Sequence, residues 1–519
     1  MKYLKLDPPT LRVNLAWRDW ALAAVFFLFG LWLYTRHNDF PSFYHPDEPS
    51  KARQVIEGEF NFNHPLLLLQ TSRFIAWTSH AAMTPQPITE CGRLASAIFS
   101  AAIVACLMLL ASHLRGTLAA AGAGLLVLAN QDVYELAHYM KEDPALTFGM
   151  AATFLAAVRC WLKPNLTRFA LLGAAMALAV SGKYIGALVL PVALVPLLGA
   201  PNPRLRSTLV MIGAFLLILV AVNYPMLASV GEATHNVERE VGMAVHGHKG
   251  LTRSVPHGVY GAVFRHATNP PIWILLGVYY AALLLLWRRI SRIEWTVALF
   301  PIVFVLILSF SPKTHFRYFL PDTVLFCTLA ALAPFSLLLG GENTRGRIAT
   351  ASLLTLLLAA GIAMSSSKVL RYDRAFHNDA RRELVTYVKE HIPANETIVQ
   401  DKRVNLASRK DPRQADSPYF LEQPLLGKLF AADVGTIEEL QARGIHYVAV
   451  SDGDYGRFFL KTHEAQDDEK AEYDRRKKFY EQLFKQGKVI WEREPGALIY
   501  IQPAIKLYEL PGPPTAPTP

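Results

Sequence analysis

The sequence has little charge and little cysteine for its length. Of its 519 residues, 18% are charged, against about 25% in an ordinary soluble protein. It contains four cysteines, all in or beside apolar runs: Cys91, Cys106, Cys160 and Cys327. The low charge excludes a large soluble enzyme, secreted or cytosolic, and the cysteine spacing provides neither a disulfide framework nor a zinc signature. No internal repeat is visible, and no small-residue cleavage site follows Tyr34, so we predict an uncleaved first membrane helix.

Apolar residues are abundant instead, at 52% of the chain, which excludes a disordered protein. They form long runs between Trp20 and Ser365, whereas residues 366–519 are charged and resemble an ordinary soluble domain. We therefore predict a polytopic α-helical membrane protein with two parts. Residues 1–365 form the transmembrane domain, and residues 366–519 form a water-soluble domain.

Eleven apolar segments are candidates for crossing the membrane, since a helix needs about 20 residues to span the hydrocarbon and fewer when its ends reach the interface. They are Trp20–Thr35, Leu94–Leu114, Leu118–Tyr139, Ala145–Trp161, Phe169–Val180, Tyr184–Gly199, Leu209–Val230, Ile272–Trp287, Trp295–Phe310, Phe319–Leu339 and Ile348–Ser365. The fifth and sixth are short, and the sequence leaves open whether they are separate helices or one broken unit.

Lysine and arginine indicate how these segments are oriented. With the N-terminus in the cytoplasm, the inner segments hold fifteen Lys and Arg residues and the short outer loops hold four. Cytoplasmic loops are rich in these residues, so we predict an inner (plasma) membrane protein whose N-terminus is cytoplasmic and whose domain 366–519 is extracytoplasmic. The same rule accounts for the net charge of +10, so no nucleic-acid partner is predicted. The two long outer loops are then Arg36–Arg93 and Gly231–Pro271.

Two regions outside the spans have recognisable local patterns. In the tail, helix-like stretches and β-rich runs predict a compact α/β domain: helices at 379–391 and 436–444, strands at 397–400, 446–451 and 497–502. In the first outer loop, the amphipathic stretch 51–58 and the apolar stretch 66–77 predict short helices, the second of them lying on the membrane interface.

Polar residues beside the predicted spans gather on the outer side. The first outer loop contains the adjacent acids Asp47 and Glu48 just after the first span, followed by Lys51 and His64. An Asp-Glu pair is most often a solvated charge or a helix N-cap. Polar groups at the membrane boundary are nevertheless typical of functional sites, so these four residues are candidates.

Three further outer segments contain charged candidates, each with an ordinary structural alternative. The turn 139–144 carries Glu142 and Asp143, which also suit a helix cap. Lys183 follows a predicted span, where a lysine can simply extend its side chain to the interface. Segment 311–318 ends in Arg317 and Tyr318, and the arginine suits either an interface anchor or a bidentate phosphate contact.

The last outer segment, 238–257, contains His246 and His248. A metal site needs more converging ligands than two histidines, so contact with a polar substrate is the better interpretation. Because all of these groups share one side of the membrane, we predict an extracytoplasmic site that handles an anionic substrate.

The order of these motifs resembles the GT-C glycosyltransferases. The segments that carry the resemblance are Pro46-Asp-Glu48, Gly58, His64-Pro65, Glu142-Asp-Pro144, Gly182-Lys183 and Arg317-Tyr-Phe-Leu-Pro321. Within GT-C, the chain looks most like the protein O-mannosyltransferase and lipid A aminoarabinose transferase branch, over roughly all of its membrane part. Its tail resembles the small periplasmic domain of many bacterial members.

The resemblance implies a polyprenyl-phosphate-linked sugar donor, membrane lipids around the site, and an extracytoplasmic hydroxyl acceptor on a glycan, lipid or protein. It implies transfer with inversion and Asp47 as the general base. Glu48 and Asp143 would orient hydroxyl groups, and Lys183 and Arg317 would hold the phosphate. The other implied substrate-binding residues are Lys51, His64, Glu142, His246, His248 and Tyr318, the two histidines helping to close the site. No cofactor is predicted, and a divalent cation is left open.

Two other classes of function remain as alternatives. A flippase or transporter for lipids or lipid-linked sugars can share this topology, but it should carry charges within its spans and often shows inverted repeats. The predicted spans here are nearly free of charge. A non-catalytic scaffold for envelope assembly would not need the Asp-Glu turn.

Overall fold

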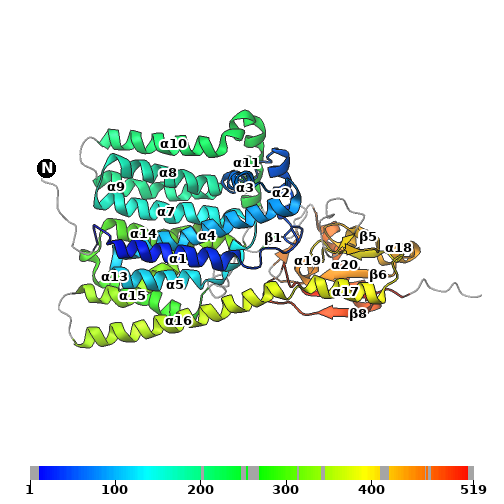
Figure 1. Cartoon of the computed structure of the whole chain (residues 1–519). Helices are drawn as coiled ribbons and strands as arrows, with labels where there is room; N and C mark the ends of the chain where they lie inside the picture. The colour runs from blue at the N-terminus through cyan, green and yellow to red at the C-terminus, as the bar shows by residue number, and fades with distance from the viewer. Residues whose placement is uncertain are drawn as a thin grey trace, which may run out of the picture.

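The computed structural model describes residues 11–199, 204–246, 253–254, 268–311, 315–340, 345–408, 420–461, 463–465, 469–498 and 500–511. Up to His377 the described chain is largely helical, and most of its helices lie side by side in one bundle (Figure 1). The sheet of the C-terminal part lies beyond one end of this bundle, and α16 (Arg345–His377) runs from the bundle into that part (Figure 1).

The bundle combines long helices with short ones. The longer helices are α1 (Trp17–Thr35), α4 (Pro85–Arg115), α7 (Glu142–Leu162), α8 (Leu166–Gly182), α10 (Arg204–Ala228), α13 (Pro270–Leu285), α14 (Arg292–Ser309), α15 (Leu320–Ser336) and α16. The shorter or peripheral helices are α2 (Glu48–Glu57), α3 (Leu67–Thr78), α5 (Thr117–Leu128), α6 (Gln131–Ala137), α9 (Leu194–Gly199), α11 (Val230–His246) and the 3-10 helices η1 (Tyr184–Ala193), η2 (Trp287–Arg289), η3 (Phe316–Phe319) and η4 (Leu337–Gly340).

The length and apolar composition of several of these helices indicate a multi-pass membrane protein. Within the described ranges, six helical segments are long and apolar enough to cross a membrane: Pro85–Arg115, Glu142–Leu162, Arg204–Ala228, Arg292–Ser309, Phe316–Leu339 and Arg345–His391. Every predicted span contains at least one helix, but the count of eleven spans stays a prediction. The predicted third span is interrupted at Asn130, whose side chain caps α6 by accepting the N–H groups of Asp132 and Val133. The chain also breaks at Lys183, whose extended backbone separates α8 from η1.

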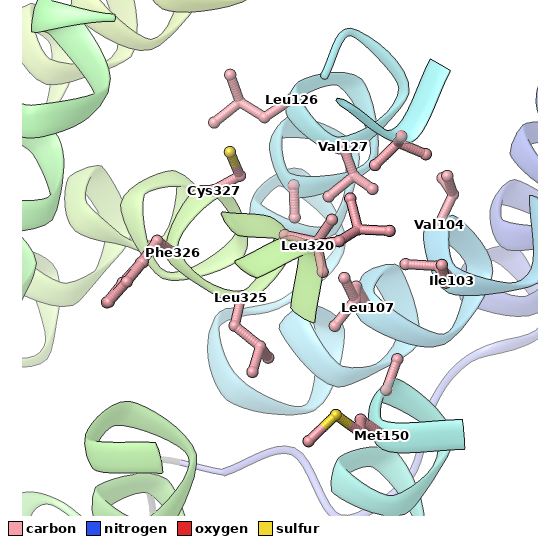
Figure 2. Close-up of a cluster of buried hydrophobic side chains, with 14 of the residues drawn as sticks. Ile103, Val104, Leu107, Leu126, Val127, Met150, Leu320, Leu325, Phe326 and Cys327 are labelled. Carbon is pink, nitrogen blue, oxygen red and sulfur yellow. The ribbon is translucent and has the colours of Figure 1, made fainter. Parts of the chain in front are cut away.

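The interior of the bundle is a continuous apolar core. Figure 2 shows part of it, where side chains from α4, α5, α7 and α15 meet: Ile103, Val104, Leu107, Leu126, Val127, Met150, Leu320, Leu325, Phe326 and Cys327. In contrast, α10 leaves most of its apolar surface uncovered, with Leu209 59% and Leu217 69% exposed. An apolar helix face of this size is stable against hydrocarbon, so we assign it to contact with lipid.

Helices α7 and α8 approach each other unusually closely, because glycines face the neighbouring backbone. A Cβ atom on Gly149 would lie 2.3 Å from the backbone nitrogen of Ala179, and one on Gly182 would lie 2.5 Å from that of Leu146. Small residues at such contacts let helix backbones meet. This approach brings the start of α7 next to the end of α8, where two of the candidate site residues lie.

The C-terminal part is built on a five-stranded mixed sheet. Its strands are β2 (Ile398–Gln400), β5 (Leu425–Gly427), β6 (Tyr447–Ser451), β8 (Lys488–Arg493) and β9 (Ile505–Glu509), in the order β5-β2-β6-β9-β8. Strands β5, β2 and β6 are parallel, whereas β9 is antiparallel to both β6 and β8. The sheet is accompanied by α17 (Ala380–His391), α18 (Ile437–Ala442), α19 (Asp452–Tyr455), α20 (Lys470–Gln486), η6 (Ala431–Asp433) and η7 (Gly456–Phe458).

In the central strands β2 and β6, alternate side chains pack on opposite faces of this sheet. Ile398 packs with Leu384 of α17, whereas the next residue, Val399, packs with Leu483 of α20. This alternation is the period of a strand buried on both sides. The predicted strands 397–400 and 446–451 correspond to β2 and β6. The predicted strand 497–502 is wrong, because the described residues of this segment form bends and a turn and no strand, and the next strand is β9.

The C-terminal part contacts the outer loops directly. Tyr44 donates a hydrogen bond to Asp379, and the Asn405 side chain donates to the carbonyl of Phe43. Strand β1 (Arg253–Ser254), from the second outer loop, pairs with β7 (His463–Glu464). A small parallel pair, β3 (Ala407–Ser408) and β4 (Phe420–Leu421), lies beside the main sheet. The domain boundary predicted after Ser365 falls within continuous α16, and the division into two domains stays a prediction.

Candidate active site

Two adjacent acids of the first outer loop, Asp47 and Glu48, lie at the start of α2 and have different surroundings. Glu48 is the first residue of α2 and is fully buried. Its carboxylate accepts hydrogen bonds from Arg93 Nε and Nη2 at 3.0 and 2.7 Å and from the N–H of Met140 at 2.8 Å. Arg93 also donates to carbonyl groups of loop residues 38, 40 and 41. The pair therefore holds the loop onto α4, and the Glu48 carboxylate is directed into the protein.

Asp47, the N-cap residue of α2, faces the other way. Its side chain is 45% exposed and pairs with Lys141, which is only 3% exposed. Burial favours a higher pKa for Asp47, but Lys141 and the charges of His45, Lys51 and Arg317 hold it below its ordinary range. Burial, together with Arg317, lowers the pKa of Lys141 to about 8 although Asp47 opposes that change. Asp47 is thus an accessible carboxylate in a group of cations.

Three consecutive residues at the start of α7, its N-cap Lys141 and the next two residues, form ion pairs that join α7 to α2 and to the residue that follows α8. Lys141 pairs with Asp47, as described above. Glu142 accepts from Lys51 of α2 at 2.7 Å, and Asp143 accepts from Lys183 at 2.7 Å. All three pairs are largely buried except at the Asp47 carboxylate. The close contact of α7 with α8 places Asp143 and Lys183 within reach of each other.

Lys183 and Arg317 lie beside the same aromatic ring. The Lys183 ammonium lies 4.4 Å and the Arg317 guanidinium 5.4 Å from the ring centre of Tyr318. Burial opposes the charge on Lys183, but Asp143 outweighs it and raises the lysine pKa. Arg317 Nε is buried and has no hydrogen-bond partner in the described part of the chain. A buried donor without a partner is costly, so an anion that accepts from Arg317 would complete this group.

A cavity of about 190 Å³ lies beside Arg317. Its lining comes from the first outer loop, from α6, from η3 and from the C-terminal part: His45, Asp132, Glu135, Leu136, Tyr139, His315, Phe316, Arg317, Tyr372, Ala497 and Tyr500. The ring of Tyr500 lies 4.3 Å from that of His45 and 5.5 Å from that of Tyr139. The C-terminal part therefore forms one wall of the cavity.

The remaining predicted residues lie nearby or outside the described ranges. His64 is close enough to Glu142, Lys51 and Lys183 for their charges to act on it, and burial lowers the pKa of His64 to about 4. His246 ends α11 with an exposed side chain, and His248 lies outside the described residues. Among the described residues, no group of three or more His, Cys, Asp or Glu side chains is arranged to hold a metal ion. The sequence analysis left the binding of a divalent cation open, and these residues do not change that prediction.

Three residues that the sequence did not single out belong to this arrangement. Lys141 lies in the same turn as the candidates Glu142 and Asp143, and this position was the signal that could have identified it. Arg93 marks the end of the first outer loop, and an arginine at a span boundary resembles an interface anchor. Tyr500 lies more than 400 positions from His45 in sequence, so no local pattern could connect them.

Comparison with known proteins identifies the fold. Residues 42–226 match the family model of dolichyl-phosphate-mannose-protein mannosyltransferases. The crystal structure of ArnT from Cupriavidus metallidurans in the apo state shares the fold, with a TM-score of 0.53 and 13% identity, over 94% of this chain and 98% of that one. The protein has the GT-C fold. This confirms the resemblance to GT-C glycosyltransferases.

Two further GT-C structures align over nearly the whole chain. ArnT from Cupriavidus metallidurans bound to undecaprenyl phosphate has a TM-score of 0.50 and 14% identity, and the alignment covers 95% of this chain and 98% of that one. The archaeal oligosaccharyltransferase AglB from Archaeoglobus fulgidus, in complex with an inhibitory peptide and a dolichol-phosphate, has a TM-score of 0.52 and 10% identity, with coverages of 95% and 89%. None of the curated protein sequences compared with the chain matches it.

Proposed function

We propose that the protein is a membrane glycosyltransferase that moves a sugar from a polyprenyl-phosphate-linked donor to a hydroxyl group of an extracytoplasmic acceptor, with inversion. One observation carries the proposal. The accessible Asp47 carboxylate lies in the same charged group as Arg317, whose buried Nε has no partner in the described part of the chain. A GT-C fold and a family match that includes Asp47 and Lys183 support it.

Lys183 and Arg317 bind the donor phosphate in this proposal. Arginine presents two parallel donors that match phosphate oxygens, whereas lysine acts as a point charge. Both cations lie over Tyr318, which restricts their positions. The cavity beside Arg317 offers room next to this anion site, and its apolar lining suits the first carbons of a lipid chain. Lys51, His64 and Glu142 support the same site by fixing the turn that carries Lys141.

Asp47 receives the acceptor proton. The acceptor oxygen forms a bond to C1 of the sugar on the face opposite the phosphate, and the bond from C1 to the phosphate oxygen breaks with its electron pair. The phosphate leaves as an anion and needs no proton. The acceptor hydroxyl becomes strongly acidic only as its oxygen bonds to C1, so a carboxylate with a low pKa is still an adequate base at that stage. Glu48 positions the loop instead of touching the reacting atoms, and Asp143 orients Lys183.

The orientation of the protein follows from the same proposal. Helix α2, which carries Lys51 and begins after Asp47, lies at the end of the bundle nearest the C-terminal part (Figure 1). Polyprenyl-linked sugars are used on the outer face of the plasma membrane in this scheme, so the C-terminal part and both long outer loops are extracytoplasmic and the N-terminus is cytoplasmic.

The test measures donor binding and sugar transfer separately in purified full-length protein. We expect Asp47→Asn to lower transfer by about 10²–10⁴-fold while donor binding stays within a few fold of the parent. Asp39→Asn is the matched control, because Asp39 is an exposed acid in the same loop. Transfer by Asp47→Asn at the parent rate would show that Asp47 is not the base. A flippase would move the lipid-linked sugar across vesicles without cleaving its C1–O bond, and that result would exclude the transferase.

A further inference from the structure

A second, larger cavity of about 390 Å³ lies where the C-terminal sheet meets the first outer loop. Phe43, Pro46 and Pro49 line it on the loop side. The two prolines stand on either side of Asp47 and Glu48 in sequence, and they give the loop a stiff wall because the proline ring fixes φ. The volume is within the range of small-ligand sites. The cavity is therefore large enough for a sugar and adjoins the segment that carries the proposed base.

The sheet contributes the other wall at a position where α/β sheets commonly bind ligands. The chain runs from β2 to β5 on one side and then from β5 to β6 on the other side of β2. This reversal makes β2 the topological switch point, and ligands bind outside the carboxyl ends of strands there. Gln400 and Gly427 end β2 and β5 in register, and both line the cavity together with Lys402 and Lys428, which follow these strands.

The charge that remains available in this cavity is positive. Lys402 and Lys428 are exposed, and neither ammonium group forms an ion pair with a described residue. The carboxylate of Asp401, in contrast, is fully used: it accepts from the N–H groups of Ala431 and Ser451 and from the Tyr480 hydroxyl. The Gln400 amide is likewise occupied by the backbone of Leu406. Among the described residues that line it, the cavity thus offers two cations without an ion-pair partner and no free carboxylate.

We propose that this cavity binds the acceptor and selects acceptors that carry a phosphate or similar compact anionic group near the hydroxyl that is glycosylated. The anionic group lies between Lys402 and Lys428 at the strand ends, and the rest of the acceptor extends along Pro46 and Pro49 toward Asp47. The donor lies on the other side of the same loop, beside His45 and Arg317. That the bound molecule is an acceptor rests on the proposed function. That the cavity binds an anionic sugar does not depend on the proposed function.

The first experiment measures binding without catalysis. The full-length protein is acetylated at lysine in detergent, and each site is quantified by mass spectrometry with glucose 6-phosphate, with glucose, or with inorganic phosphate. We expect glucose 6-phosphate at millimolar concentration to slow acetylation of Lys402 and Lys428 about fivefold, with little effect of glucose. Lys389 and Lys485, exposed lysines of α17 and α20 that do not line the cavity, are the controls. The protection should weaken in high salt.

The second experiment uses variants and separates the two proposals. Lys402→Gln should abolish the protection of Lys428, and Lys428→Gln that of Lys402, while Lys389→Gln should change neither. The double variant Lys402→Gln/Lys428→Gln should raise KM for an anionic acceptor about 20-fold and leave donor binding unchanged, because exposed charges contribute modestly each.

Two outcomes would overturn the inference. Equal protection by glucose and glucose 6-phosphate, or none by either, would show that the cavity does not select an anionic sugar. Equal protection by inorganic phosphate and glucose 6-phosphate would show a free-anion site and not an acceptor site. If the parent protein transfers no sugar from any polyprenyl-linked donor, the proposed function fails, and the acetylation result still decides whether the cavity binds an anionic sugar.

Discussion

Substitution of Glu48 should destabilise the protein, whereas substitution of its neighbour Asp47 should abolish sugar transfer. Glu48→Gln removes the negative charge from a pair in which both side chains are 0% exposed, while Arg93 remains in place. The amide keeps the shape of the carboxylate and its oxygen still accepts hydrogen bonds, but its NH2 group can only donate and the amide cannot balance the guanidinium charge. The arginine would also keep its three contacts to loop carbonyls.

The magnitude follows from the burial of the pair. Removing one partner of a buried ion pair costs about 3–5 kcal/mol, because an uncompensated charge stays in the interior. Asp47 is 45% exposed, and Lys141, whose pKa burial and Arg317 already lower to about 8, can release its proton when its partner is lost, so the loss of this contact should cost about 1 kcal/mol or less. In a chain of this size, we expect the midpoint of thermal unfolding to fall by about 5 °C for Glu48→Gln and to change little for Asp47→Asn.

The assay is thermal unfolding of the purified proteins in one detergent, followed by measurement of donor binding and of sugar transfer below the unfolding range. Glu48→Gln should lose stability and keep measurable transfer when it is folded. Asp47→Asn should unfold with the parent and lose transfer. If Glu48→Gln unfolds at the parent temperature, the buried Glu48–Arg93 pair does not hold the loop and the division of roles is wrong.

Three further predictions concern the anion site, the pH response and the topology. Arg317→Lys should weaken polyprenyl-phosphate binding about tenfold although the charge is retained, because lysine cannot make the bidentate contact; parent-like affinity would contradict the clamp. Burial holds the pKa of His64 near 4, so His64 contributes stability that is present above its unfolded pKa near 6.5 and lost as the pH falls toward 4. Thermal unfolding between pH 7 and 5 should therefore depend less on pH in His64→Gln, and an unchanged pH dependence would exclude His64 as a contributor. A reporter enzyme fused after Pro519 should be active outside the cytoplasm, and activity confined to the cytoplasm would reverse the orientation.

The sequence predicted the features of this protein that depend on neighbouring residues. Apolar runs locate helices because a membrane helix must satisfy its own backbone and bury its side chains in lipid. The runs around Ile103 and Leu325 are therefore visible without a structure. The sequence also indicated a break near Lys183, because the predicted spans on either side of it are short. It did not indicate the extended backbone at this residue.

The features that sequence did not predict depend on distant contacts. Arg93 decides which of the two acids, Glu48 or Asp47, faces solvent. It lies 45 positions from Glu48, and no local sequence pattern predicts that its side chain is buried. The segment around Tyr500 has the apolar composition of a strand, but it packs against His45 and forms turns instead. In both cases tertiary packing decides the conformation, and local propensity favours a different one.

The unbroken course of α16 has a consequence for the size of molecules that can be glycosylated. The helix has 33 residues, so it is about 50 Å long at about 1.5 Å per residue. The hydrocarbon takes up about 30 Å, which leaves roughly 20 Å of rigid helix between the lipid and the C-terminal sheet. On the proposed topology, the sheet therefore stands at a set distance from the bilayer, because continuous α16 leads from the membrane to the C-terminal part. On the proposed function, a substrate anchored in the outer leaflet is then sorted by how far its hydroxyl group projects from the lipid as well as by its charge.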